Sequence, residues 1–166
     1  KALLHAARVI EDAKAMGEFG VGFGAPQIDA ARLRGWKDSV VARLTGGLDS
    51  LARQRKVTVI RGRGRFVSAH ELQVEEGTGA ARSVSFAQCV IAAGSESVRL
   101  PGLPDDPRII DSTGALELDL PESLLVVGGG IIGLEMATVY AALGVRVSVV
   151  ELTPGLMPGC DRDLVR

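Results

Sequence analysis

Three glycines and one glutamate form the spacing in this chain that most directly indicates chemistry. Gly128, Gly130 and Gly133 follow an apolar run at residues 124–127, and Glu151 ends a second apolar run. Glu151 lies at roughly the 20-residue offset of the acid in a dinucleotide-binding βαβ unit. The first glycine permits a sharp turn, the second lets the backbone approach a diphosphate, and the third lets a helix pack closely on the strand. The spacing therefore predicts a dinucleotide site.

The helix after this turn would present unpaired N–H groups and a partial positive charge to the phosphates. The carboxylate of Glu151 is expected to accept hydrogen bonds from both hydroxyls of the adenosine ribose and to repel a 2′-phosphate. Residues 152–155 include no arginine, so NAD is favoured over NADP. The alternative is a glycine-rich turn without a ligand, which the two apolar runs and the acid make the weaker interpretation. The motif alone does not separate NAD from FAD. The residues of the turn that are predicted to bind the nucleotide, as NAD, are Gly128, Gly129, Gly130, Ile131, Ile132, Gly133 and Leu134, together with Glu151.

The elements that must position this turn follow from the hydrophobic periodicity. Apolar residues at intervals of three and four predict helices, and short apolar or alternating runs predict strands. The helices are predicted at 2–16 and 29–54, the strands at 57–60, 66–67, 72–74, 84–86, 89–93, 124–127 and 147–150, and a turn at 77–79. These elements predict an α/β fold of the Rossmann-like FAD/NAD(P)-binding type. It has a parallel sheet with a βαβ unit and a small β-meander.

The composition narrows the class of protein. The chain has 166 residues, 46% of them hydrophobic and only 4% aromatic, so aliphatic side chains must form its core. The net charge is −1, and no cluster of basic residues in the sequence suggests a nucleic-acid partner. No apolar run approaches the roughly 20 residues that span a bilayer, and no signal peptide pattern is present. We therefore expect a cytoplasmic protein that binds neither nucleic acid nor a membrane.

Several isolated side chains are expected to have structural roles. Cys89 lies in an apolar run and is expected to be a small buried residue, whereas Cys160 lies in a Pro- and Gly-rich loop and is expected to be exposed. Their spacing matches no metal-ligand pattern, so neither a metal site nor a disulfide is predicted. Trp36 lies on the apolar stripe of the second helix and is expected in the core. Asp161 is expected to cap the first turn of a further helix.

Three further stretches combine with the glycine turn. They are Lys1-Ala2-Leu3-Leu4-His5, the run from Val90 to Ser95 followed by Leu100-Pro101-Gly102, and the run from Asp111 to Leu116. In this order they resemble the dihydrolipoamide dehydrogenase family of flavin disulfide reductases, which are the E3 components of the 2-oxo acid dehydrogenase complexes. The resemblance extends over the whole chain. In that family electrons pass from dihydrolipoamide to a cysteine pair, then to FAD and then to NAD.

The resemblance implies that the chain is an internal fragment of a larger multi-domain protein. Residues 1–97 would form part of an FAD-binding domain, 98–120 a linker, and 121–166 the N-terminal half of an NAD-binding domain. The redox cysteines, the FAD glycine motif and the His-Glu base would lie outside it, so no catalytic residue is expected within the fragment, which alone should be inactive. The implied partners of the intact protein are the lipoyl domain of E2 as substrate, the E2 core, and a second copy in a homodimer.

The resemblance also assigns residues to the two cofactors. Lys1 matches a lysine beside flavin N5, and Glu135 matches an acid near the nicotinamide, so the two are expected to form an ion pair that supports hydride transfer. Further FAD contacts are implied at Gly64, Ala93, Gly94 and Ser95. Alanine stands at position 93 where the family has threonine, so a contact there must come from the backbone.

Two alternatives remain at this point. One is a sister enzyme of the mercuric or glutathione reductase type, although Glu151 disfavours the NADP that glutathione reductases use. The other is a non-catalytic NAD-binding module. A Cys-x4-Cys-x-Pro-Ser run just upstream of Lys1 would distinguish the reductases from such a module.

Overall fold

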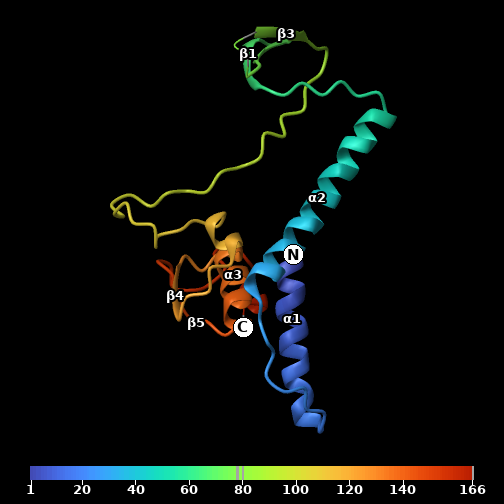
Figure 1. The fold of residues 1–166 in the computed structure, drawn as a ribbon. Coiled ribbons are helices and arrows are strands. Elements are labelled where there is room, and N and C mark those ends of the chain that lie inside the picture. Colours follow the sequence, from blue (N-terminus) through green and yellow to red (C-terminus); the bar gives the residue numbers. More distant parts are fainter. Residues whose placement is uncertain (78, 80, 166) are drawn as a thin grey trace. The chain divides into compact units, whose positions relative to one another are not determined.

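The computed structural model describes residues 1–77, 79 and 81–165, and its chain divides into two compact units (Figure 1). One unit joins Lys1–Ala42 to Ser97–Arg166, and the other is Arg43–Glu96. Each unit is described by itself.

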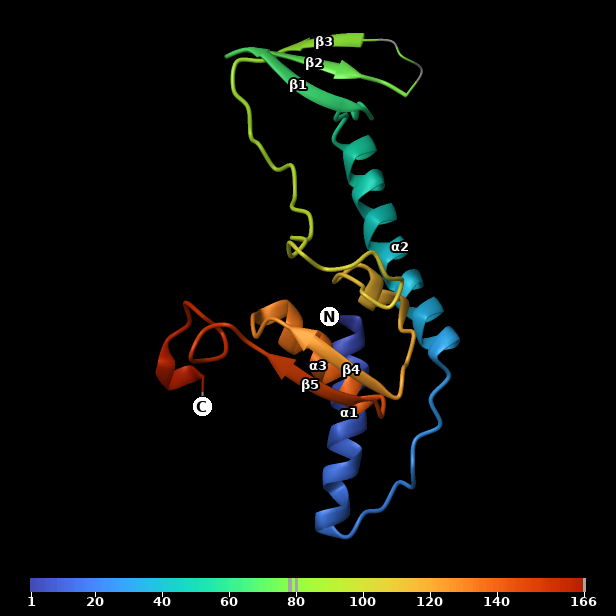
Figure 2. The ribbon, with the colours of Figure 1, turned by 90° about the vertical axis from the view of Figure 1, so that its left-hand side faces the viewer.

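The first unit contains the predicted strand–helix–strand element. Strand β4 (Ser123–Val127) leads into helix α3 (Ile131–Ala142), which returns to strand β5 (Arg146–Val150). The two strands pair in parallel, with Leu124 opposite Val147, and Figure 2 shows the two arrows side by side. A parallel pair requires a crossover, and α3 supplies it. The predicted βαβ unit is confirmed.

Helix α1 (Ala2–Ala15) packs against α3 to form the core of this unit (Figure 2). Tyr140 is fully buried, and its hydroxyl donates to the carbonyl oxygen of Ala115 at 2.9 Å. A buried phenol needs such a partner. The core residues are mostly aliphatic, as the composition predicts: Leu3, Ala7, Leu118, Val139, Tyr140, Ala142, Leu143 and Val145.

The long predicted helix is helix α2 (Ala30–Gln54). Asp29 Oδ1 accepts from the backbone N–H of Arg32 at 3.0 Å and so caps its first turn. The glycine pair at 46–47 lies within the helix, and a methyl group on either glycine would meet nothing within 4 Å. Trp36 is 42% exposed, so its prediction as a core residue is wrong; among the described residues of the same stripe, only Leu33, one turn earlier, packs against the core.

Short 3₁₀ helices complete the first unit at η1 (Met16–Phe19), η2 (Gly114–Glu117) and η3 (Arg162–Leu164). Lys37 Nζ donates to the carbonyl oxygen of Leu116 at 3.0 Å, which ties α2 to η2. Asp161 Oδ1 accepts from the N–H of Asp163 at 3.0 Å, so the predicted cap at Asp161 is confirmed. Among the described residues no helix is long and apolar enough to cross a membrane.

The second unit contains the predicted β-meander. Strands β1 (Arg63–Ser68), β2 (Glu71–Glu75) and β3 (Ala81–Ser85) form an antiparallel sheet in sequence order. Val74 of β2 is buried, and the rings of Phe66 and Phe86 meet edge to face with their centroids 6.1 Å apart. The meander is confirmed, whereas the predicted turn at 77–79 includes Thr78, which lies outside the described residues.

Two predicted strands are not formed. Residues 57–60 and 89–93 have no strand structure, because a strand requires a neighbour for its N–H and C=O groups and none of the described strands pairs with them. Cys89 is exposed, as is Cys160. The prediction of a buried Cys89 is therefore wrong for the same reason, while the exposure predicted for Cys160 is confirmed.

Candidate functional site

The glycine turn adopts the backbone geometry that its first and third glycines permit. Gly128 has a φ of +112°, a value that residues other than glycine rarely adopt. Its N–H donates to the carbonyl oxygen of Val150 at 2.8 Å, which fastens the turn to β5. A Cβ on Gly133 would overlap the carbonyl oxygen of Gly128 and lie 3.2 Å from a methyl of Val126. The absence of a side chain at Gly133 thus sets the close approach of α3 to β4.

Gly130 has a different role from its two neighbours in the motif. It precedes α3 with φ −78° and ψ 176°, an extended conformation open to any residue. A Cβ built there would meet nothing within 4 Å. The fold itself therefore does not require a glycine at position 130. The open space in front of the backbone is what a diphosphate needs in order to approach the first turn of α3.

Glu151 closes the turn from the end of β5. Its Oε2 accepts the N–H of Gly129 at 2.6 Å, and its Oε1 accepts both the N–H and the hydroxyl of Thr153 at 2.8 Å. These hydrogen bonds, led by the backbone N–H of Thr153 and then that of Gly129, lower the pKa of Glu151 from 4.5 to about 2. The carboxylate is therefore ionised and oriented at neutral pH.

The hydrogen bond from Gly129 to Glu151 separates the backbone N–H groups of the turn into two sets. The N–H of Gly129 is directed to Glu151. The N–H groups of Ile131, Ile132 and Gly133 belong to the first turn of α3, where no partner exists within the helix. They are the donors that the structure leaves for an anion, beside the space at Gly130.

The segment after β5 folds back over the turn, which the sequence did not reveal. The N–H of Met157 donates to the carbonyl oxygen of Gly129 at 2.8 Å, and Arg162 Nη2 donates to the carbonyl oxygen of Met157 at 2.6 Å. A Cβ on Gly129 would lie 2.6 Å from a methyl of Leu156. The only sequence signal was a Pro- and Gly-rich loop, which does not specify the direction that the loop takes.

Lys1 and Glu135 form the ion pair that was predicted for them. Lys1 precedes α1 and Glu135 lies in the second turn of α3, so the packing of the two helices brings these residues together. The side chain of Lys1 is 84% exposed and that of Glu135 is 29% exposed. Solvent therefore screens the pair, and its contribution to stability is small.

The residues predicted to contact FAD lie partly in the second unit. Gly64 is on β1 opposite Val74 of β2, and Ala93, Gly94 and Ser95 lie in an irregular segment where Gly94 has a φ of +77°. They belong to Arg43–Glu96, whereas Lys1 belongs to the other unit. Their common role at a flavin therefore stays a prediction.

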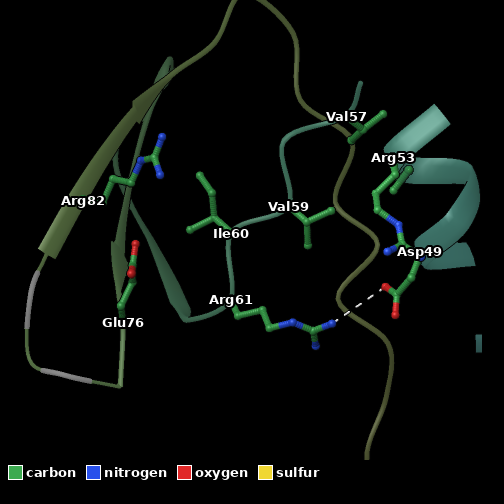
Figure 3. Close-up of a pocket in the computed structure, with 9 residues that line it drawn as sticks. Asp49, Arg53, Val57, Val59, Ile60, Arg61, Glu76 and Arg82 are labelled. Atoms are coloured by element: carbon green, nitrogen blue, oxygen red, sulfur yellow. Dashed lines mark ion pairs between the residues drawn. The ribbon is translucent and has the colours of Figure 1, made fainter. Parts of the chain in front are cut away.

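A separate hollow of about 570 Å³ opens in the second unit (Figure 3). Figure 3 shows an ion pair across part of it, between Arg61 and Asp49, at 3.8 Å. None of the residues predicted to bind a nucleotide lines it; the lining residues are Asp49, Ala52, Arg53, Val57, Val59, Ile60, Arg61, Glu76 and Arg82. Within the described ranges, no group of three or more His, Cys, Asp or Glu side chains could hold a metal ion.

The family model described as pyridine nucleotide-disulphide oxidoreductase matches residues 1–166. The chain belongs to this family. It is 52% identical over 168 residues to the dihydrolipoyl dehydrogenase of Vibrio parahaemolyticus and 50% identical over 167 residues to that of Haemophilus influenzae. These matches cover 100% and 99% of this chain. The chain spans only 35% of the length of either relative.

Solved structures share the fold. LpdA from Mycobacterium tuberculosis superposes with a TM-score of 0.83 at 24% identity, over 99% of this chain and 37% of that one. The HOCl-induced flavoprotein disulfide reductase RclA from Escherichia coli has a TM-score of 0.70 at 28% identity, over 98% of this chain and 34% of that one. The predicted α/β, Rossmann-like fold of a flavin disulfide reductase is confirmed.

The second and third glycines of the motif, Gly130 and Gly133, provide a matched pair of substitutions. Gly133→Ala should destabilise the βαβ unit by about 1–3 kcal/mol, because the added methyl group overlaps the Gly128 carbonyl. Gly130→Ala should leave the free energy of unfolding within about 0.5 kcal/mol of the parent and still raise the dissociation constant for NAD at least about tenfold, because the methyl group occupies the approach to α3. Thermal denaturation and calorimetric titration with NAD measure the two effects. Equal stability losses in both variants would contradict this assignment.

The titration of Glu151 gives a prediction with a defined pH window. Since the folded pKa is lowered, the contribution of the carboxylate to stability is complete above pH 4.5 and is lost as the pH falls from 4.5 towards 2. Carboxyl carbon NMR should therefore show Glu151 ionised at pH 4 with a midpoint near 2. Glu151→Gln should remove the matching part of the acid dependence of unfolding. A midpoint near 4.5 would mean that the hydrogen bonds to Gly129 and Thr153 are absent in solution.

Proposed function

We propose that the intact protein oxidises protein-bound dihydrolipoamide to lipoamide and reduces NAD⁺ to NADH. Two thiols of the substrate lose two electrons and two protons and form a disulfide, while NAD⁺ gains a hydride and one proton is released. The main support for this proposal is the glycine turn, in which the ionised Glu151 accepts a hydrogen bond from the N–H of Gly129 at 2.6 Å. The turn lies in a chain that is about half identical to dihydrolipoyl dehydrogenases.

The residues of this chain fit the NAD side of that reaction. The backbone N–H groups of Ile131, Ile132 and Gly133 would bind the diphosphate, with Gly130 leaving space for it. Glu151 would accept hydrogen bonds from the ribose hydroxyls, and its negative charge would repel the 2′-phosphate of NADP. This preference supports dihydrolipoamide oxidation over the NADP-dependent glutathione reductase type.

The residues predicted for FAD fit a flavin through small side chains and backbone rather than through charged groups. Gly64, Ala93, Gly94 and Ser95 would let the backbone approach the cofactor, and Lys1 would place a cation near its ring system. FAD, when bound, supplies two-electron chemistry between thiols and a nicotinamide. Glu135 would hold Lys1 in place through the ion pair, so the charge near the cofactor is fixed by the packing of α1 on α3.

The remaining parts of the proposal concern the protein as a whole. Its substrate would be the lipoyl domain of E2, its docking partner the E2 core of a 2-oxo acid dehydrogenase complex, and its oligomer a homodimer in the cytoplasm. The names of the relatives support the role in a 2-oxo acid dehydrogenase complex.

The test of the function uses the purified intact protein. It should be yellow, with a flavin absorption spectrum, and should form NADH from dihydrolipoamide and NAD⁺, with NADP⁺ a poor acceptor. Mercuric ion with NADPH, and glutathione disulfide with NADPH, serve as the comparison substrates. Faster turnover with either of those pairs would replace the proposal by the corresponding sister enzyme, and a colourless protein that binds NAD without turnover would identify a non-catalytic module.

The Lys1–Glu135 ion pair generates a separate prediction. Glu135→Gln should lower the rate of NAD⁺ reduction by roughly tenfold or more while leaving the fold intact, because the pair is solvent-screened and contributes little stability but holds a charge near the cofactors. Stopped-flow measurement of flavin reduction and reoxidation checks this rate. Glu117→Gln is the matched control, since Glu117 also forms an exposed ion pair, with Arg34, away from the glycine turn. Unchanged kinetics in Glu135→Gln would remove this role.

A further inference from the structure

Thr153 is the residue that holds the carboxylate of Glu151, which is the ribose-binding group of the proposed site. Both the N–H and the hydroxyl of Thr153 donate to Oε1 of Glu151 at 2.8 Å. The other oxygen of Glu151 accepts the N–H of Gly129 at 2.6 Å. The carboxylate is therefore held by hydrogen bonds from two sides, from the glycine turn and from the segment that follows β5.

These hydrogen bonds limit how many acceptor positions of the Glu151 carboxylate remain for a ribose. A carboxylate has about four lone-pair positions. Three of them take the donors named above, which leaves one on Oε2 for a ribose hydroxyl. The second ribose hydroxyl needs a position on Oε1 that the hydroxyl of Thr153 occupies in this structure.

The structure also provides an alternative acceptor for that hydroxyl. The oxygen of Thr153 lies 2.9 Å from the carbonyl oxygen of Gly155, nearly the same distance as to Glu151. The hydroxyl has a single proton, so it donates to one acceptor at a time. Rotation about one bond transfers this donation to Gly155 and leaves Oε1 with the backbone N–H of Thr153 and a vacant position.

The segment that contains Gly155 is itself held in place. A Cβ on Gly155 would lie 2.7 Å from Arg162 Nη1, and the guanidinium of Arg162 donates to the carbonyl oxygens of Met157 and Cys160. The N–H of Met157 returns to Gly129. The alternative acceptor is therefore fixed relative to the glycine turn.

We propose that Thr153 is a positioning residue that determines nucleotide specificity: its hydroxyl orients Glu151 in the empty site and turns to Gly155 when the ribose binds. This inference rests on the proposed NAD site. Pre-ordering a carboxylate lowers the cost of fixing it on binding. It also directs the negative charge to the place where the 2′-phosphate of NADP would lie.

The experiment compares Thr153→Val, which removes the hydroxyl and keeps the shape, with Thr153→Ser, which retains the hydroxyl. In the intact protein, Thr153→Val should raise KM for NAD⁺ about three- to tenfold with kcat within about twofold, a change of up to 1.4 kcal/mol in binding. The ratio of kcat/KM for NAD⁺ to that for NADP⁺ should fall by a similar factor. Thr153→Ser should restore both quantities to within about twofold of the parent.

A control and the contrary outcomes make the test decisive. Thr113→Val makes the same change at an exposed threonine beside η2, away from the turn, and should alter neither quantity. Equal losses for NAD⁺ and NADP⁺ would indicate a general loosening of the loop and overturn the proposal. A lower KM in Thr153→Val would also overturn it, because competition between the hydroxyl and the ribose would then outweigh the orienting effect of the hydroxyl on Glu151. Failure of the parent protein to use NAD⁺ would instead refute the proposed function.

Discussion

The close approach of α3 to β4 is the constraint on which the βαβ unit depends. At Gly133 there is no room for a side chain, because a methyl group would overlap the carbonyl oxygen of Gly128. That contact brings the first turn of α3 to the carboxyl end of β4 and β5 (Figure 2). If α3 began farther from β4, its free N–H groups would face more solvent. Each N–H group would then attract an anion more weakly, because water screens the interaction.

The close packing of the βαβ unit also explains the orientation and the low pKa of the Glu151 carboxylate. Since β4 and β5 are paired in parallel, the end of β5 lies beside the glycine turn, and Glu151 reaches the N–H of Gly129. Hydrogen bonds from Gly129 and Thr153 then stabilise the ionised form and lower its pKa to about 2. Backbone donors and the hydroxyl of Thr153, rather than a neighbouring cation, thus hold this negative charge in place.

The two units differ in how fully their residues are packed. The first has a continuous aliphatic core between α1 and α3, which also brings Lys1 to Glu135. In the second, Val74 of the meander is buried, but the irregular segment after the meander leaves Val90 91% exposed and Ile91 73% exposed. The residues predicted to bind NAD lie around one turn of the first unit, whereas those predicted to contact FAD are divided between the two units, with Lys1 in the first and Gly64, Ala93, Gly94 and Ser95 in the second.

The sequence by itself determined the elements whose signals are local. Glycine spacing, apolar periodicity and the position of the acid sufficed for the βαβ unit, the long helix and the meander, because each depends on residues close together in the chain. Only the tertiary structure decided that residues 57–60 and 89–93 form no strand and that Trp36 and Cys89 are exposed, since strands and burial require neighbours distant in sequence. It also decided the return of the loop after β5, in which Thr153 and Met157 contact the turn. A loop takes its direction from such backbone hydrogen bonds, and those leave no pattern in the side chains.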